Sequence, residues 1–563
     1  MSYSNLEKKI ARLASKKPQA SQDLIGSYDC GDFELHIDSV PDDPSRNPLR
    51  MRVRVGIAGA GFPDTAFSTK SREIAARDFM TRTFNAGAAA QSALSRIRGA
   101  RIFIDRPGPV ILETSAVVVG DGIIEARFTA DLPIEGDRIV GNALRELFMK
   151  NIPGIVRASL VYDGFDAVKF TATVDTAEDA DTLRNMLPEM GLAAFVADGS
   201  VPAGKAGIVT RGASKAVQFR APETLAVTVE LPNRGAVRGL GVPAGITVVA
   251  GERTSGKTAL LTALALGVYN HPPDDGRELI VTAPDAVYVP FEEGRRIENV
   301  DISPIIPKGS VGDDMQSFRT EAATPVESQA ANIIEALEIG TSLLLFNEDS
   351  VAPGFATRDA RIQELLSGDE VTLTPLVYIL PALRDEMGVS AVIALGGSGD
   401  FLDIADTVIV MSGSELTDAT EKAAKIVRER PTGRKSIPSA TAIQRRDRRP
   451  FRTGLEPVKL KKEEKVRPHG SGYVQYGDEF IDLDKVIQLV SSSQARGIAR
   501  GLSLVRRLMD GSRSLRDAVN EVMKRIDAVG LDTLSNRRMG DLAGFRPHEL
   551  AAAVNRLKQL KVK

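Results

Sequence analysis

Residues 251–258 form a glycine-containing segment whose residue types are suited to contacting phosphate groups. The sequence GERTSGKT fits the pattern G-x4-G-K-[ST], in which backbone N–H groups surround a phosphate, the lysine bridges the β- and γ-phosphates and the hydroxyl ligates Mg²⁺. An apolar run, 246–250, precedes it and a helix-forming run begins at Ala259, which is the strand–loop–helix setting that the motif requires. We therefore predict that the chain binds ATP with Mg²⁺. The residues expected to contact the nucleotide are Gly251, Glu252, Arg253, Thr254, Ser255, Gly256, Lys257 and Thr258, with Thr258 also on the metal.

A second group of polar residues follows the apolar run 341–346. Glu348 stands where a carboxylate polarises the water that attacks the γ-phosphate, so we predict that it is catalytic together with Lys257. Asn347 stands where an acid normally helps to hold Mg²⁺. Its amide can accept a hydrogen bond from a metal-bound water but adds no negative charge, so we expect a lowered affinity for the metal. Asp349 could take that place only if the strand end were shifted by two residues.

The loop Gly396–Asp400 (GGSGD) follows the apolar run 389–395. Ser398 or Asp400 could contact the γ-phosphate there, and we predict Ser398 as a third catalytic residue. The alternative is a simple glycine turn at the end of a strand.

The apolar pattern predicts the elements that position these loops. Continuous apolar runs alternate with helical segments between residues 221 and 415, which indicates a parallel sheet covered on both faces. These runs are 246–250, 279–281, 343–346, 389–395 and 407–411. Residues 1–220 mix period-two strands, such as 51–55, with helices such as 71–84. Further helices are expected at 482–489, at 514–529 and from Pro547 to the last residue.

We therefore predict an α/β protein with four segments. They are an N-terminal α+β domain (1–220), a nucleotide-binding core (221–415), a basic linker or arm (416–470) and a mostly helical C-terminal domain (471–563).

Composition narrows the class of protein. The chain has 563 residues, of which 43% are hydrophobic and 26% charged, as is ordinary for folded soluble domains. A single cysteine, Cys30, excludes an intramolecular disulfide, and the four histidines have no pair at zinc-ligand spacing. No apolar run approaches the roughly 18 residues of a membrane helix, and the N-terminus lacks the apolar centre of a secretory signal. We expect a cytoplasmic protein that does not contact a membrane.

Charge is distributed unevenly although the net charge is only −2. Residues 422–467 contain sixteen Lys or Arg and five Asp or Glu. Such a stretch can neutralise the phosphates of a nucleic acid, with binding that depends on salt rather than on sequence. The alternative is a solvated linker. The residues predicted to contact nucleic acid are Arg445, Arg446, Arg448, Arg449, Arg452, Lys461 and Lys462.

The chain resembles a family of predicted ATPases of the ABC class. The resemblance extends over nearly the whole sequence and includes the segments 26–29, 192–199, 267–271, 275–278, 301–304, 328–338 and 396–400. It implies a P-loop core of ABC type, with a mixed sheet and an antiparallel β subdomain, between an N-terminal and a C-terminal domain. It also implies a head-to-tail homodimer with two nucleotides between the subunits, and a possible RNA partner, because one relative is associated with RNA editing in trypanosome mitochondria.

The sequence departs from the family pattern where chemistry occurs. The family usually has SGSTSQ before the helix that leads to the second motif, whereas this chain has a Thr324-x-x-Glu327 capping box. Ser328 remains as a donor to the partner's nucleotide. Asn347 replaces the usual aspartate. These changes predict an ATP-binding dimeric switch acting on RNA, with hydrolysis slowed or lost. The alternatives are an active ATPase in which Glu348 suffices, and a nucleotide-dependent scaffold for protein partners.

Overall fold

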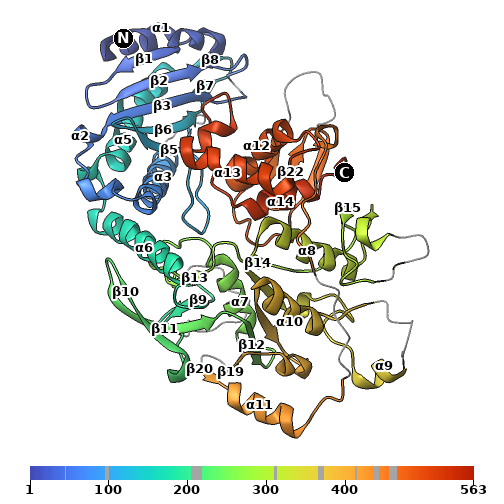
Figure 1. The fold of residues 1–563 in the computed structure, drawn as a ribbon. Coiled ribbons are helices and arrows are strands. Elements are labelled where there is room, and N and C mark those ends of the chain that lie inside the picture. The colour runs from blue at the N-terminus through green and yellow to red at the C-terminus, as the bar shows by residue number, and fades with distance from the viewer. Residues whose placement is uncertain are drawn as a thin grey trace. The chain divides into compact units, whose positions relative to one another are not determined.

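The computed structural model describes residues 1–44, 46–94, 100–204, 218–307, 309, 314–365, 373–412, 415–434, 443–455 and 466–563. They form two compact units (Figure 1). The first combines Met1–Glu178 with Val529–Gly544, and the second combines Asp179–Ala528 with Phe545–Lys563. The domain boundaries given above remain predictions. None of the helices in the described ranges is long and apolar enough to span a membrane.

The first unit contains an antiparallel sheet of strand order β1-β2-β3-β6-β4, with β5 also paired to β6. Its central strand confirms the predicted alternation, because Met51, Val53 and Val55 are buried while Arg52 and Arg54 lie on the other face. The strands are β1 (Gly26–Asp29), β2 (Glu34–Ser39), β3 (Leu49–Gly56), β4 (Ile102–Phe103), β5 (Val117–Gly120) and β6 (Ile123–Ala130), with a hairpin of β7 (Ile134–Glu135) and β8 (Arg138–Ile139). The helices are α1 (Tyr3–Leu13), α2 (Ile57–Ala60), α3 (Lys70–Leu94), α4 (Gly141–Glu146), α5 (Ile152–Leu160) and the first part of α6 (Ala167–Met186).

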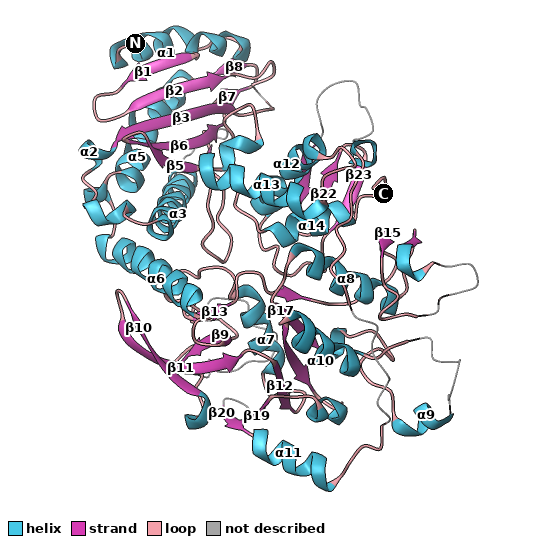
Figure 2. Ribbon diagram, viewed as in Figure 1, coloured by secondary structure: helices cyan, strands magenta, loops and turns pink. Residues whose placement is uncertain are grey.

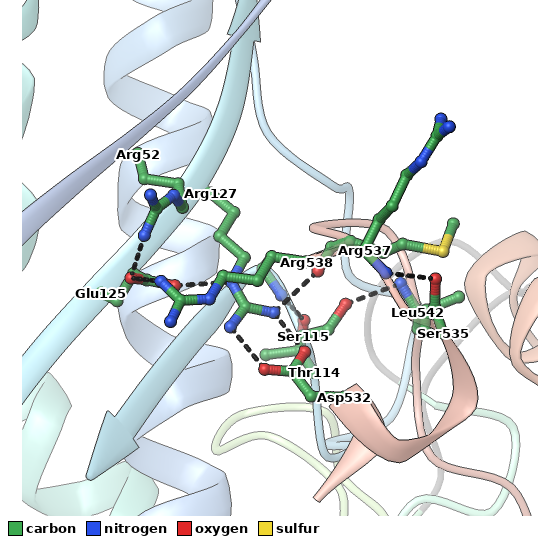
Figure 3. Close-up of polar contacts among 12 residues, drawn as sticks. Arg52, Thr114, Ser115, Glu125, Arg127, Asp532, Ser535, Arg537, Arg538 and Leu542 are labelled. Atoms are coloured by element: carbon green, nitrogen blue, oxygen red, sulfur yellow. Dashed lines mark hydrogen bonds and ion pairs between the residues drawn. The ribbon is translucent and has the colours of Figure 1, made fainter. Parts of the chain in front are cut away.

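A segment near the C-terminus, 529–544, completes the first unit (Figure 3). Arg127 donates to the Asp532 carboxylate at 2.7 Å and to the Met539 carbonyl at 2.9 Å. Arg538 forms an ion pair of 3.2 Å with Glu125. The N-terminal unit therefore depends on residues that are about 400 positions away along the chain.

The second unit is built on a sheet of order β14-β17-β18-β12-β19-β20. All neighbouring pairs are parallel except β19 and β20, and the strands are apolar because helices cover both faces. The strands are β12 (Ile246–Gly251), β14 (Val287–Tyr288), β17 (Leu343–Asn347), β18 (Ser390–Leu395), β19 (Thr407–Ser412) and β20 (Glu415–Asp418). The helices are α7 (Lys257–Leu266), α8 (Pro325–Ile339), α9 (Ala360–Leu365), α10 (Leu376–Met387) and α11 (Thr420–Glu429).

A second, antiparallel sheet of order β10-β11-β9-β13 accompanies it, as Figure 2 shows. Its strands are β9 (Leu192–Ala197), β10 (Ala226–Leu231), β11 (Gly235–Pro243) and β13 (Ile280–Thr282), and β15 (Ile297–Val300) pairs with β16 (Phe318–Thr320). The predicted α/β core with a mixed sheet and an antiparallel β subdomain is confirmed.

The C-terminal part of the second unit is mostly helical, with α12 (Ser492–Leu508), α13 (Leu515–Val529) and α14 (Pro547–Asn555), and it has a small sheet of β21 (Val466–His469), β22 (Tyr473–Tyr476) and β23 (Glu479–Asp482). The helix predicted at 482–489 is wrong. These residues form turns, and the Gln488 amide donates to the carbonyls of Ala265 and Ala286 at 2.9 Å each. Tertiary contacts thus replace the helical hydrogen bonds.

Candidate nucleotide-binding site

Three loops leave the same edge of the parallel sheet in the second unit. They follow β12, β17 and β18, because parallel strands all end at one edge. Strand β18 lies between β12 and β17, so the loop after it lies between the loops that carry Lys257 and Glu348. A Cβ atom built on Gly396 would lie 3.4 Å from Glu348 Oε2 and 3.7 Å from Lys257 Nζ. The sheet therefore brings the three predicted segments together.

The loop between β12 and α7 needs its glycines. Gly256 has a φ of 93°, which lies in the left-handed region that favours glycine. A Cβ atom on Gly251 would lie 2.5 Å from the carbonyl oxygen of Met411. The backbone path of the motif is therefore open only to glycine at these two positions.

Lys257 and Ser255 provide the donors on the inner side of this loop. Lys257 is only 6% exposed, and its Nζ donates to the Glu252 carbonyl at 3.0 Å. The Ser255 hydroxyl is buried and has no hydrogen-bond partner within the described ranges. These groups fit a phosphate, since a cation and a buried donor face a loop at the N-terminus of α7. The exposed side chains of the loop are Glu252, Arg253, Thr254 and Thr258.

Asn347 ends β17 and caps the short 3-10 helix 348–350. Its side-chain oxygen accepts from the Asp349 N–H at 3.4 Å, and the residue is 6% exposed. Because β17 ends at Asn347, the two-residue shift that would bring Asp349 to this position does not occur. No group of three or more His, Cys, Asp or Glu among the described residues could hold a metal by itself. Mg²⁺ would thus rest on Thr258, Asn347 and the nucleotide's own oxygens.

The Glu348 carboxylate is surrounded by donors of the loop after β18. It accepts from the N–H groups of Gly396, Gly397 (3.0 Å) and Ser398 (2.9 Å), and from the Ser398 hydroxyl. Partial burial raises the pKa of this carboxyl, but the hydrogen bonds from Ser398 and the three N–H groups outweigh it, so the pKa lies below its ordinary value. Glu348 is therefore ionised and firmly oriented.

The predicted capping box at the start of α8 is confirmed. The Thr324 hydroxyl accepts from the Glu327 N–H at 3.4 Å, and the Glu327 carboxylate accepts from the Thr324 N–H at 2.8 Å. Ser328 is fully buried; its hydroxyl donates to the Pro325 carbonyl at 2.8 Å and accepts from the Glu292 N–H at 2.9 Å. A contact between Ser328 and a second subunit's nucleotide would require these bonds to break.

The predicted nucleic-acid residues divide into three groups. Arg445, Arg446, Arg449 and Arg452 are exposed. Arg448 is buried and pairs with Glu338 at 2.5 Å, so it is not available to a nucleic acid, and this part of the prediction needs correction. Lys461 and Lys462 lie outside the described residues.

Sequence reasoning missed two features of the site. The N–H donors of Gly396 and Gly397 could have been foreseen, since the alternation of glycine and serine after a strand is typical of loops that present backbone donors. Arg434, which contacts the continuation of this loop, gave no signal, because it stands among many other cations.

Three family models together match most of the chain. A model of the ABC-class ATPase P-loop domain matches residues 166–448, a model of the N-terminal region of ATPases of the ABC class matches 3–163, and a model of the MRB1590 C-terminal domain matches 465–563. The uncharacterized protein MJ1628 of Methanocaldococcus jannaschii is 29% identical over 231 residues, which are 39% of this chain and 50% of that protein. The chain thus spans about half the length of this relative. A structure of the ADP conformation of MJ1267, an ATP-binding cassette of an ABC transporter, matches 37% of this chain and 94% of its own at 12% identity and a TM-score of 0.22.

Proposed function

Because the chain belongs to the ATPases of the ABC class, we propose that it binds ATP with Mg²⁺ at Gly251–Thr258 and hydrolyses it slowly. Lys257 would exchange the Glu252 carbonyl for phosphate oxygens, and the N–H groups of the loop would donate to the same oxygens. Thr258 and Asn347 would face the metal, and neither adds a negative charge. ATP supplies the phosphoanhydride bond that is hydrolysed, and the residues of the chain orient the nucleotide.

The position of the Glu348 carboxylate is the observation that carries slow turnover. A general base must come within hydrogen-bonding distance of the attacking water, whereas this carboxylate is held by four hydrogen bonds from Gly396, Gly397 and Ser398. These bonds also lower its pKa, and a weaker base accepts a proton less readily. We therefore propose that nucleotide binding, rather than rapid hydrolysis, changes the state of the protein, as a head-to-tail homodimer.

The same switch would act on nucleic acid through the stretch 422–467. Within residues 443–455, four arginines are exposed, at 445, 446, 449 and 452. Arg446 also pairs with Asp301 at 2.9 Å but keeps half of its side chain exposed. Arginine guanidinium groups bind phosphates in a bidentate manner, and such binding weakens steeply with salt.

Two aromatic side chains next to this stretch favour a single-stranded partner. Tyr473 and Phe480 are 42% and 55% exposed. The register pairs Tyr473 with Asp482 and Gln475 with Phe480, so the two rings share one face of the β22–β23 hairpin. Exposed rings on a sheet can stack on unpaired bases. Single-stranded RNA is thus the partner that we propose.

The first test compares ATP binding with ATP hydrolysis. Wild type should bind ATP and turn it over slowly, Lys257→Ala should lose binding, and Asn347→Asp should raise turnover by restoring a metal-facing charge. Brisk hydrolysis by wild type would contradict the slow-turnover proposal, and absence of ATP binding would contradict the nucleotide site itself.

The second test measures affinity for a labelled single-stranded RNA at several salt concentrations. Arg445→Gln with Arg449→Gln should weaken binding and reduce the salt slope, while Phe480→Ala should weaken binding with the slope unchanged. If neither variant changes the affinity, the stretch is a linker.

A further inference from the structure

Arg434 belongs to the basic stretch by sequence, but its side chain is buried against Asp400, Asp403 and Tyr378 of the second unit. Its side chain is only 7% exposed. One guanidinium nitrogen, Nη2, donates to the Asp403 carboxylate at 2.6 Å and to the Asp400 carbonyl at 3.2 Å. The guanidinium lies over the ring of Tyr378, 5.2 Å from its centre. This arginine is therefore held in one orientation.

The two aspartates that Arg434 contacts belong to the short 3-10 helix η8 (Gly399–Asp403). Ser398 is the N-cap residue of η8, and Ser398 also donates twice to the Glu348 carboxylate. The Gly399 N–H donates to the Gly397 carbonyl at 3.0 Å, and this bond joins the start of η8 to the Gly396–Ser398 loop. A movement of η8 would thus displace the donors of Glu348.

We propose that Arg434 is a positioning residue that fixes η8 and, through it, the Gly396–Ser398 loop that orients Glu348. The inference rests on the proposed role of Glu348 in hydrolysis.

Electrostatics explains why an arginine is needed at this place. Asp400 and Asp403 lie in one short helix, and burial together with Asp403 raises the pKa of Asp400 while Arg434 opposes the rise. Thr432 also donates to the Asp403 carboxylate, at 3.1 Å. Without the guanidinium the two carboxylates would repel each other with no cation between them, and η8 would be tied to the segment after α11 by the Thr432 hydroxyl without the ion pair.

The experiment combines amide hydrogen exchange with hydrolysis rates in the full-length protein. In Arg434→Gln, exchange in the peptide that covers 396–403 should rise at least tenfold, with other peptides of the second unit unchanged. The rate of a single ATP turnover should rise by about tenfold, with the affinity for ATP unchanged, because a loosened loop holds the Glu348 carboxylate less firmly and the attacking water gains its base more readily. Arg434→Lys should be intermediate, since lysine keeps the charge but not the planar fork.

Arg430→Gln is the matched control, because Arg430 is an exposed arginine four residues earlier in the same stretch. It should behave as wild type. Unchanged exchange at 396–403 in Arg434→Gln would overturn the inference, and this readout does not depend on turnover. Loss of ATP binding with faster exchange throughout the unit would also overturn it, since that result indicates a general role in stability. A wild type that fails to bind ATP contradicts the proposed function instead.

Discussion

Replacing Arg448 with methionine tests whether this arginine of the basic stretch serves the core rather than a nucleic acid. Arg448 and Glu338 are 8% and 2% exposed. The guanidinium donates to Glu338 at 2.9 and 2.5 Å and to the Asn555 side chain at 2.8 Å. Methionine retains most of the side-chain volume, so the change removes charge and hydrogen bonds without opening a large cavity.

The expected loss of stability follows from the burial of Glu338. Removing one partner of a buried ion pair leaves an uncompensated charge, and this costs about 3–5 kcal/mol. A second substitution, Glu338→Gln, removes that charge, so the double variant should recover part of the loss. Arg449→Met at the exposed neighbouring position should change the free energy of unfolding by less than about 0.5 kcal/mol.

Two assays are needed. Urea unfolding is monitored by circular dichroism, since the chain has no tryptophan, and RNA binding is measured in parallel. Arg448→Met should shift the unfolding midpoint of the second unit and leave RNA affinity unchanged under conditions where it is folded. Arg449→Met should do the reverse. If Arg448→Met unfolds like wild type and weakens RNA binding as much as Arg449→Met, the side chain is exposed in solution and the reasoning from burial is wrong.

Three further outcomes follow from individual contacts. Ser398→Ala removes a donor to Glu348, so the pKa of that carboxyl should rise and the acid limb of the single-turnover pH profile should move to higher pH; an unmoved limb would show that Glu348 is not the titrating base. In the first unit, burial raises the pKa of Glu125, but Arg54, Arg127 and Arg52 lower it more, from 4.5 to about 2. Its contribution of about 3 kcal/mol is present above pH 5 and is lost as the pH falls toward 2; the pH dependence of unfolding should therefore be flatter in Glu125→Gln. Asp532→Asn should speed proteolysis within 529–544, because Arg127 loses its ion pair with that segment and keeps only the one with Glu125, whereas Asp527→Asn, outside that segment, should not.

Much of the second unit could be predicted from the sequence because local and global signals agree there. The apolar runs at 246–250, 343–346 and 389–395 became strands of one parallel sheet, since a run that is apolar throughout must be buried on both faces. The phosphate-binding motif then fixed the edge of the sheet at which the site lies. The order of the strands was not predictable, because the sequence does not show which strand separates β12 from β17.

Long-range contacts explain what could not be predicted. Arg448 and Arg449 are adjacent and chemically identical. Arg448 is buried because it pairs with Glu338 on α8, whereas Arg449 is exposed. The turns at 482–489 depend on carbonyls more than 200 residues away. Segment 529–544 comes directly after the predicted helix 514–529 in the chain, yet it belongs to the N-terminal unit because Arg127 binds Asp532.

The two charged groups of the nucleotide site, Lys257 and Glu348, both form hydrogen bonds within the chain. The strength of these contacts determines which group is released first. Lys257 donates one hydrogen bond, to the Glu252 carbonyl, whereas Glu348 accepts four, from three N–H groups and a hydroxyl. Each of these bonds has one ionised partner, so the larger number of bonds holds Glu348 more firmly. A phosphate can therefore displace the contact of Lys257 more easily than that of Glu348. We infer that nucleotide binding precedes release of the catalytic carboxylate. The ATP-bound state therefore persists until Glu348 is released and hydrolysis can follow.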